Sequence, residues 1–310
     1  MTGLGRVPSG RDSAAHAAGD HAELGEVDWL RDLTEGERLA RESGKPIFLL
    51  FQEVPGCSTC VKFGRNVLSG PLMVEAIETE FVPIAIFNNE GGADRAALER
   101  FGEPAWNNPV VRFVDAGGRD LLPRRDRLWS RSAILERMLA SLAAADREVP
   151  RYLEVAAQES RIDAAARATL AMHCFWQGEA CVGDISGVVA TRPGWLGGRE
   201  VVEIRFDPAR VTYEELLTQA KRRRCASRVF AHDDDQLRDA RAVFGENATL
   251  ERARASAAKP SDDKRHLRAS AYVQVDLTPL QRTRVNSALA AGEDPRKWLS
   301  PRQRASLDSP

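Results

Sequence analysis

Three of the five cysteines in this 310-residue chain have a spacing or a setting that suits redox chemistry. Cys57 and Cys60 form a Cys-x-x-Cys pair, the spacing of dithiols that cycle between two thiols and a disulfide. Cys174 ends an apolar run, and two aromatic residues, Phe175 and Trp176, follow it directly. These types and spacings predict one sulfur that can be oxidised and one pair that can reduce it.

The residues around Cys174 predict a nucleophilic sulfur at a turn from a strand to a helix. Residues 167–172 have the apolar character of a strand, and the segment after Trp176 favours a helix. Backbone N–H groups at the start of a helix stabilise a thiolate. Phe175 and Trp176 would then wall an apolar pocket beside the sulfur, although such aromatic side chains also serve simply to fill a core.

The Cys-x-x-Cys pair has two interpretations. In a redox pair, Cys57 is expected to be the attacking thiolate because it lies nearest the start of the helix, and Cys60 would resolve the mixed disulfide. The pair could instead be half of a zinc site. No second Cys-x-x-Cys or His pair at ligand spacing accompanies it in the sequence, so we expect no metal and favour the redox interpretation.

Composition places the chain among ordinary globular proteins. It has 43% hydrophobic and 29% charged residues and a net charge of −1, which argues against nucleic acid as a ligand of the whole molecule. Basic residues are in excess from Lys221 to the C-terminus, with Arg222, Arg223 and Arg224 as the densest point. A solvated helix face is the simple interpretation of this excess, and a docking patch for an acidic partner is the alternative.

The chain length and the terminal segments set the expected organisation and location. A chain of 310 residues is long enough for two domains. No run of about 18 apolar residues occurs, so no membrane span is expected. Residues 1–25 are polar and glycine-rich without an apolar signal segment, and we expect a disordered lead there. Five cysteines, an odd number, fit redox thiols in a cytoplasmic protein.

The first half of the chain alternates predicted helices with apolar strands. Helices are expected over 28–43, from the Cys57 turn onward, and over 73–80, 93–101 and 130–147; strands are expected over 47–51, 81–87 and 110–114. Asp115-Ala116-Gly117-Gly118 is a hairpin turn signal. This order of strand, redox turn, helix, strand, hairpin and final helix is typical of thioredoxin.

Residues 29–145 resemble thioredoxin-fold proteins, and two motifs are similar to a bacterial group within them. The expected first helix ends in Ser-Gly-Lys-Pro, and Val54-Pro55-Gly56-Cys57 is similar to bacterial thioredoxin-like proteins with a Val-Pro-Gly-Cys or Val-Pro-Gly-selenocysteine signature. The resemblance implies a cis-proline facing the redox pair and contacting substrate, a position that Pro109 matches. The chain departs from the thioredoxin pattern at Ser58-Thr59. These residues lie between the two cysteines, where they tune the reduction potential of the pair.

The second half predicts an α+β domain over 165–310, with residues 146–163 as the crossing segment after a first domain at 26–148. Strands are expected over 167–172, 187–192 and 199–206, with 193–198 joining the last two. Thr212 is the expected N-cap of a helix, and a long helix is expected over 236–258. Thr278-Pro279 and Ser300-Pro301 each predict the start of a C-terminal helix.

Several ordered blocks of this half resemble peptide methionine sulfoxide reductase A. His173-Cys174-Phe175-Trp176-Gln177 occupies the position of that family's Gly-Cys-Phe-Trp-Gly motif. Residues 187–198, 200–208 and 213–217 match the blocks that follow it, so the likeness covers roughly 168–220. The chain departs from the pattern at both glycines that flank Cys-Phe-Trp, and Trp195 replaces the family's tyrosine.

The resemblance implies a role for each matching residue. Cys174 would attack the sulfoxide sulfur, and Glu200 would protonate the departing oxygen. Phe175, Trp176 and Trp195 would hold the methyl group. A second thiol would then condense with the sulfenic acid on Cys174; Cys225 and Cys181 are candidates, Cys225 being favoured because it can return on a loop, and Cys57 of the other domain is a third candidate.

Three functions remain open from the sequence. The first is a thiol-dependent enzyme that reduces methionine sulfoxide, or a related oxidised sulfur compound, at Cys174 with the Cys57/Cys60 pair as reductant. The second is a thiol–disulfide oxidoreductase whose C-terminal domain only binds a substrate or partner, and the third is a redox-sensing interaction module. The expected partners are an oxidised protein or peptide and an external thioredoxin or glutathione-type reductant, with no cofactor, nucleic acid or membrane.

Overall fold

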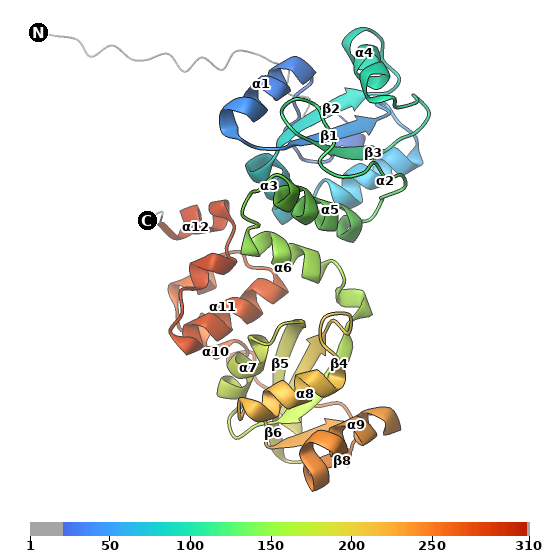
Figure 1. Cartoon of the computed structure of the whole chain (residues 1–310). Coiled ribbons are helices and arrows are strands. Elements are labelled where there is room, and N and C mark those ends of the chain that lie inside the picture. The colour runs from blue at the N-terminus through green and yellow to red at the C-terminus, as the bar shows by residue number, and fades with distance from the viewer. Residues whose placement is uncertain (1–20, 309–310) are drawn as a thin grey trace, which may run out of the picture. The chain divides into compact units, whose positions relative to one another are not determined.

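The computed structural model describes residues 21–308, and most of the lead predicted over 1–25 lies outside them. The chain forms two compact units that meet in sequence between Glu148 and Val149 (Figure 1). Within the described part of the lead, Ala22–Leu24 form a 3₁₀ helix, η1, and Leu24 is fully buried. The prediction of disorder up to residue 25 is therefore wrong at its end, because Leu24 packs into the first unit.

The first unit is built on a three-stranded sheet. Its strands are β1 (Ile47–Gln52), β2 (Val82–Phe87) and β3 (Val110–Val114), in the order β2-β1-β3, with β1 parallel to β2 and antiparallel to β3. Every residue of β1 is buried, as its unbroken apolar run predicts. The helices are α1 (Leu33–Ser43), α2 (Ser58–Val67), α3 (Pro71–Glu80), α4 (Gly92–Phe101) and α5 (Arg131–Ala144). The predicted thioredoxin-like fold is confirmed.

Two local predictions in this unit need correction. The helix expected from residue 28 begins at Leu33, because the side chain of Asp32 caps it while Leu30 forms a bridge to Ile84. The turn at 115–118 forms, but only a single bridge from Val114 to Asp120 follows it in place of a second hairpin strand.

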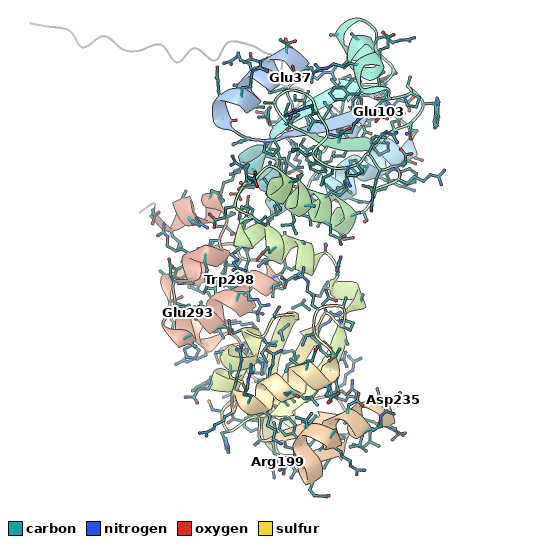
Figure 2. The ribbon with its side chains drawn as sticks, viewed as in Figure 1. Glu37, Glu103, Arg199, Asp235, Glu293 and Trp298 are labelled. Atoms are coloured by element: carbon teal, nitrogen blue, oxygen red, sulfur yellow. A yellow bond between two sulfur atoms is a disulfide. The ribbon has the colours of Figure 1, made fainter. Side chains whose placement is uncertain are left out.

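A buried ion cluster fixes the loops beside β3. The side chain of Glu103, labelled in Figure 2, is fully buried and accepts hydrogen bonds from Arg112 of β3 and from Arg124. Arg112 also pairs with Asp120. A buried carboxylate needs such partners to offset its lost hydration. The cluster therefore ties the segment before β3, which contains Pro109, to the segment after it.

The second unit is built on a six-stranded sheet. Its strand order is β8-β7-β4-β6-β5-β9, and the central strand β4 is antiparallel to β6 and β7. The strands are β4 (Ala166–Ala171), β5 (Val188–Leu196), β6 (Arg199–Phe206), β7 (Arg228–Ala231), β8 (Ala248–Leu250) and β9 (Ser256–Ala257). Helices α7 (Phe175–Gly183), α8 (Tyr213–Arg222) and α9 (Asp234–Phe244) pack with one face of this sheet to form its main core.

The region after α9 differs from the prediction. Residues 236–258 were expected to be one helix, but α9 ends at Phe244, followed by Gly245 at a φ of 59° and then by the two short strands β8 and β9. Strand β8 pairs in parallel with β7, which gives the segment a tertiary partner that its helix-favouring composition does not reveal. The connection after β5 is also shorter than expected, because β5 runs on to Leu196.

Helices from both ends of the second unit complete it. Helix α6 (Arg151–Glu159) lies in the segment predicted only to cross between domains, and Glu159 accepts a hydrogen bond from the N–H of Leu280 at the start of α11. The remaining helices are η2 (Ile162–Ala164), η3 (Gly245–Asn247), α10 (Arg265–Arg268), η4 (Ala271–Gln274), α11 (Pro279–Ala291), η5 (Pro295–Trp298) and α12 (Pro301–Asp308). Both predicted N-caps, Thr212 and Thr278, are confirmed with full capping boxes.

A buried arginine of α11 anchors the end of α7. The guanidinium of Arg284 donates hydrogen bonds to the carbonyl oxygens of Gly183, Ile185 and Val188, and its carbon lies 5.7 Å from the ring centre of Trp298. These carbonyls follow or end a helix and have no intrahelical donors.

Among the described residues, no helix is long and apolar enough to cross a bilayer.

The close packing of α2 against η1 gives a test of the first unit. A Cβ added to Gly64 of α2 would lie 2.0 Å from the carbonyl oxygen of Ala22 and 2.6 Å from backbone atoms of Glu23. Gly64→Ala is therefore expected to lower the free energy of unfolding by about 1–3 kcal/mol, measured by chemical denaturation. Gly91→Ala is the control, because no atom lies within 4 Å of its added Cβ, and equal effects of the two changes would contradict the prediction.

Candidate redox sites

Cys57 and Cys60 lie at the N-terminus of α2 with different environments. Cys57 is the exposed N-cap residue and Cys60 is buried, with 3.6 Å between their sulfur atoms. The backbone N–H of Cys60 lowers the pKa of the Cys57 thiol. Burial, and then the hydrogen bond with Cys57, raises the pKa of Cys60 to about 12. These environments favour the outer sulfur as the thiolate at neutral pH, the role that the sequence predicts for Cys57.

The segment before β3 contacts the inner cysteine. The thiol of Cys60 donates to Oδ1 of Asn108 over 2.7 Å, and the Asn108–Pro109 bond is cis, as predicted. The indole N–H of Trp129 donates to the carbonyl of Pro109 over 3.4 Å. The Val54–Pro55 bond, whose isomer was not predicted, is also cis. Pro109 thus follows directly the residue that binds the buried sulfur.

One carboxylate joins the cysteine pair. Ligand atoms of Glu53, Cys57 and Cys60 lie within 4.8 Å of one another. A structural zinc ion takes four protein ligands, and in the described part of the chain this group of His, Cys, Asp and Glu side chains contains three. The arrangement therefore suits a dithiol better than a closed zinc site.

Cys174 occupies the equivalent place in the second unit. It follows β4, caps α7 and is half-buried. Glu200, at the start of β6, accepts a hydrogen bond of 2.7 Å from the N–H of Phe175, the residue after the cysteine. The backbone of Glu200 also pairs with Met172. The structure therefore brings Glu200 to the start of the helix that carries Cys174.

Three aromatic rings gather beside this cysteine. Phe175 is buried and makes edge-to-face contacts with Trp176, at 6.2 Å between ring centres, and with Trp195, at 5.6 Å. Trp176 is 37% exposed and Trp195 45%. Trp195 stands opposite Glu200 in the β5–β6 ladder, so these two side chains share one face of the sheet. The arrangement provides apolar surface open to solvent next to a sulfur and a carboxylate.

Sequence reasoning missed the part that residues 262–265 play. Oδ1 of Asp262 accepts from the indole of Trp176, and Arg265 lies over the same ring. Lys264 is buried and pairs with Glu179, a fully buried carboxylate of α7. Glu179 was the one sequence signal that could have indicated this contact. A charged residue within an apolar helix requires a partner from elsewhere in the chain.

The comparisons with known proteins follow this division of the chain. The Thioredoxin-like family matches residues 28–116. Peptide methionine sulfoxide reductases MsrA match other parts of the chain, with 43% identity for that of Geobacter metallireducens and 40% for that of Sulfolobus acidocaldarius, each over 16% of this chain. That of Geobacter sulfurreducens is 35% identical over 24% of this chain and 67% of its own length. The chain belongs to the MsrA family.

The MsrA likeness is partial in extent. The chain spans 42% and 38% of the length of the Geobacter metallireducens and Sulfolobus acidocaldarius relatives. A solved structure of a DsbH oxidoreductase matches 46% of this chain and 95% of that chain with 15% identity and a TM-score of 0.33. This MsrA-family chain thus joins a thioredoxin-like domain to a methionine sulfoxide reductase-like part.

The two remaining cysteines of this MsrA-family chain correct one prediction. Cys181 and Cys225 were expected to offer a free thiol that condenses with oxidised Cys174. The structure joins them to each other in a disulfide, with 5.8 Å between their Cα atoms. The chain after α8, which ends at Arg222, brings Cys225 to Cys181 near the end of α7 and not to Cys174 at its start. With this bond formed, neither sulfur is available to Cys174, and Cys57 remains as the candidate of the three.

The unequal environments of the thioredoxin-like pair predict selective alkylation. In the reduced protein near pH 7, iodoacetamide should modify Cys57 more than about tenfold faster than Cys60, because the thiolate reacts and only Cys57 has a lowered pKa. The rate should rise with pH until Cys57 is fully ionised. Peptide mass spectrometry measures the site, Cys60→Ser is the control that keeps Cys57 reactive, and faster labelling of Cys60 would contradict the assignment.

Proposed function

We propose that this protein reduces methionine sulfoxide at Cys174 and that the Cys57/Cys60 pair supplies the electrons. The observation that supports this most directly is the group formed by Cys174, Glu200 and three aromatic rings at the N-terminus of α7. A nucleophile, a carboxyl group and an exposed apolar wall are the three parts that sulfoxide reduction requires.

The site suits a small apolar group attached to sulfur. The methyl group and side chain of methionine would pack against Phe175, Trp176 and Trp195, of which the two tryptophans are open to solvent. Trp176 is held by Asp262, so this wall is fixed before substrate binds. An open wall of this kind admits an oxidised protein or peptide as substrate more easily than a closed cavity would.

The chemistry would proceed in two balanced steps. The sulfur of Cys174 attacks the sulfoxide sulfur, Glu200 gives a proton to the oxygen, and oxygen passes to the cysteine; methionine is released and Cys174 becomes a sulfenic acid. A second thiol then attacks that sulfenic acid, forming a disulfide and releasing water. Cys57 is proposed for this second thiol because its pKa is lowered and it is exposed.

Regeneration would use the other sulfur of the pair. Cys60 attacks the mixed disulfide between Cys57 and Cys174, which frees Cys174 and leaves a Cys57–Cys60 disulfide. The 3.6 Å between the two sulfur atoms fits this exchange. An external thioredoxin or a glutathione-type thiol would then reduce the pair and complete the cycle.

Removal of the nucleophile is the first test. Cys174→Ser should abolish reduction of a methionine sulfoxide peptide while disulfide reduction of insulin by the Cys57/Cys60 pair continues. Turnover of the sulfoxide by Cys174→Ser would refute the proposed site. Sulfoxide activity absent already in the wild type, with insulin reduction present, would favour instead a thiol–disulfide oxidoreductase whose second unit only binds a partner.

Replacement of the carboxyl group tests the proton donor. Glu200→Gln keeps an oxygen for the N–H of Phe175 but removes the acid, and it should lower kcat for sulfoxide by about 10²–10⁴. Glu203→Gln, a change of the same type on the same strand, is the control, because Glu203 pairs with Arg192 on the opposite face of the sheet. Equal kinetics of the two variants in a single-turnover assay would rule out the role of Glu200.

Mapping of sulfur linkages tests the reductant. After one equivalent of sulfoxide peptide, the Cys60→Ser variant should accumulate a disulfide between Cys57 and Cys174, because the second exchange is blocked. Non-reducing peptide mass spectrometry detects this link. Accumulation of a sulfenic acid on Cys174 without the link would show that the thioredoxin-like pair does not reduce it directly.

A further inference from the structure

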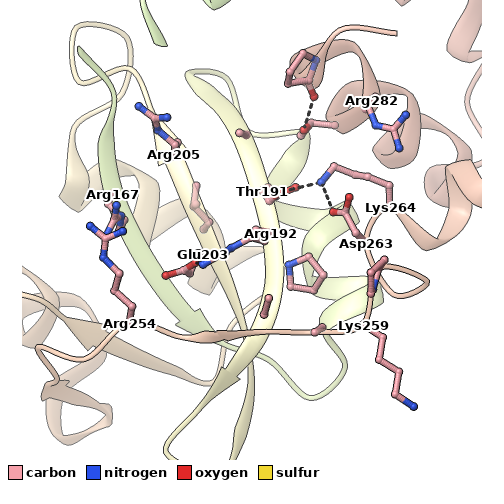
Figure 3. Close-up of a pocket in the computed structure, with 18 residues that line it drawn as sticks. Arg167, Thr191, Arg192, Glu203, Arg205, Arg254, Lys259, Asp263, Lys264 and Arg282 are labelled. Atoms are coloured by element: carbon pink, nitrogen blue, oxygen red, sulfur yellow. Dashed lines mark hydrogen bonds and ion pairs between the residues drawn. The ribbon is translucent and has the colours of Figure 1, made fainter. Parts of the chain in front are cut away.

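A cavity of about 670 Å³ lies in the second unit, and basic side chains dominate its wall (Figure 3). Seven lysine or arginine residues line it against two carboxylates, Glu203 and Asp263. The basic residues are Arg167, Arg192, Arg205, Arg254, Lys259, Lys264 and Arg282. A hollow lined by one sign of charge focuses its field on a ligand of the opposite sign.

The sheet places this cavity away from Cys174. The β5–β6 ladder sets Arg192 opposite Glu203, three residues along β5 from Trp195, which stands opposite Glu200. Because side chains alternate between the faces of a strand, the Arg192–Glu203 pair and the Trp195–Glu200 pair lie on opposite faces. The cavity therefore opens mainly on the face that does not carry the aromatic rings of the redox site.

The cations of the cavity divide into paired and unpaired groups. Arg192 pairs with Glu203, Lys264 pairs with Glu179 and Asp263, and Arg205 donates to the carbonyl of Ile162. Four others make no side-chain hydrogen bond or ion pair within residues 21–308; they are Arg167, Arg254, Lys259 and Arg282. The structure thus leaves several positive charges in a hollow with no counter-charge from the protein.

Two of the cations also face each other across neighbouring strands of the sheet. Arg167 of β4 and Arg205 of β6 are directly opposite partners, and like charges in that position destabilise a sheet. Figure 3 shows Arg254 reaching toward Arg167 from the segment that crosses this face of the sheet. The guanidinium groups of Arg167 and Arg254 therefore approach each other, with Arg205 on the neighbouring strand, and an anion bound among these cations would offset the cost in stability.

The chemistry of the wall selects the class of anion. A guanidinium group is a planar fork of N–H donors that matches the oxygen atoms of phosphate. The volume is in the range of sites for small organic ligands, larger than one phosphate needs. The uncharged part of the wall has two threonines, Thr191 and Thr283, and is otherwise apolar, formed by Ala190, Pro193, Ile204, Ala257, Ala258, Pro260 and Pro279.

We propose that this cavity binds a small phosphate ester with several phosphate groups and an apolar or planar part, of the type of a nucleoside polyphosphate. The phosphates lie among Arg167, Arg205 and Arg254, and the rest of the ligand packs on the alanine and proline wall. The site is separate from the sulfur chemistry, and it uses none of Cys57, Cys60 and Cys174.

Calorimetric titration of the full chain tests the site with three probes. These are ATP, tripolyphosphate as its phosphate part alone, and citrate as an anion without phosphate, in magnesium-free buffer at about 50 mM and about 200 mM salt. ATP should bind most tightly, tripolyphosphate next and citrate most weakly, and added salt should weaken all three. Absence of heat with ATP, or citrate binding as tightly as tripolyphosphate, would overturn the proposal.

A pair of matched variants locates the binding. Arg254→Gln removes a cation of the cavity, and Arg241→Gln removes an exposed cation of α9 that does not line it. The first should weaken ATP binding about tenfold, the effect of one lost charge-assisted contact, and the second should leave it within about twofold. Equal affinities of the two variants would refute the site.

Two further variants separate binding from folding and from catalysis. Arg167→Gln should weaken ATP binding while the free protein keeps or raises its Tm, because it relieves the opposition to Arg205. A lowered Tm would mean that Arg167 supports the fold instead. Cys174→Ser should bind ATP like the wild type, whereas loss of binding would contradict a site separate from the redox chemistry.

Discussion

The turn from a buried strand into a helix is the feature on which both sulfur sites depend. Cys57 caps α2 and Cys174 caps α7, and each helix follows a buried strand of its own sheet. A short turn from a buried strand into a helix places the junction residue at the edge of the core, where its side chain is within reach of solvent. The same backbone arrangement thus presents a sulfur twice in two unrelated sheets.

The two sulfurs differ in the side chains that surround them. In the first unit the neighbour of the outer cysteine is a second cysteine, buried and tied to Asn108, which suits exchange between sulfur atoms. In the second unit the neighbours are the carboxyl group of Glu200 and a set of aromatic rings. Both sites have a cysteine at the start of a helix. They differ in the side chains that the strands and loops bring to that helix start.

Local patterns predicted the fold where an element carries its own signal. The apolar runs at 47–51 and 110–114 are strands, and the capping boxes at Thr212 and Thr278 begin helices at those residues. The prediction failed over 236–258, where alanine and arginine favour a helix but three-residue strand β8 gains its stability from pairing with β7. A strand that short has too few residues to show a period.

The motifs of the candidate site could be predicted from the sequence, but the contacts that hold their side chains in place could not. Cys174, Glu200 and the aromatic residues follow from ordered sequence blocks, and the structure places them together. The contacts of Asp262 with Trp176 and of Lys264 with Glu179 join residues some 85 positions apart, and the charges of the cavity converge from five separate segments. Such convergence depends on tertiary folding, which no local pattern records.

Helix α7 carries two sulfurs in different bonding states. Cys174 at its start is a free, half-buried thiol, whereas Cys181 further along is also half-buried and is bonded to the buried Cys225. Thiol exchange requires a nucleophile to approach a sulfur in line, so the core that covers Cys225 leaves the Cys181 side as the more open side of this bond. With the bond formed, the cross-link holds the middle of α7 to the segment after α8 while the start of the same helix presents a free thiol.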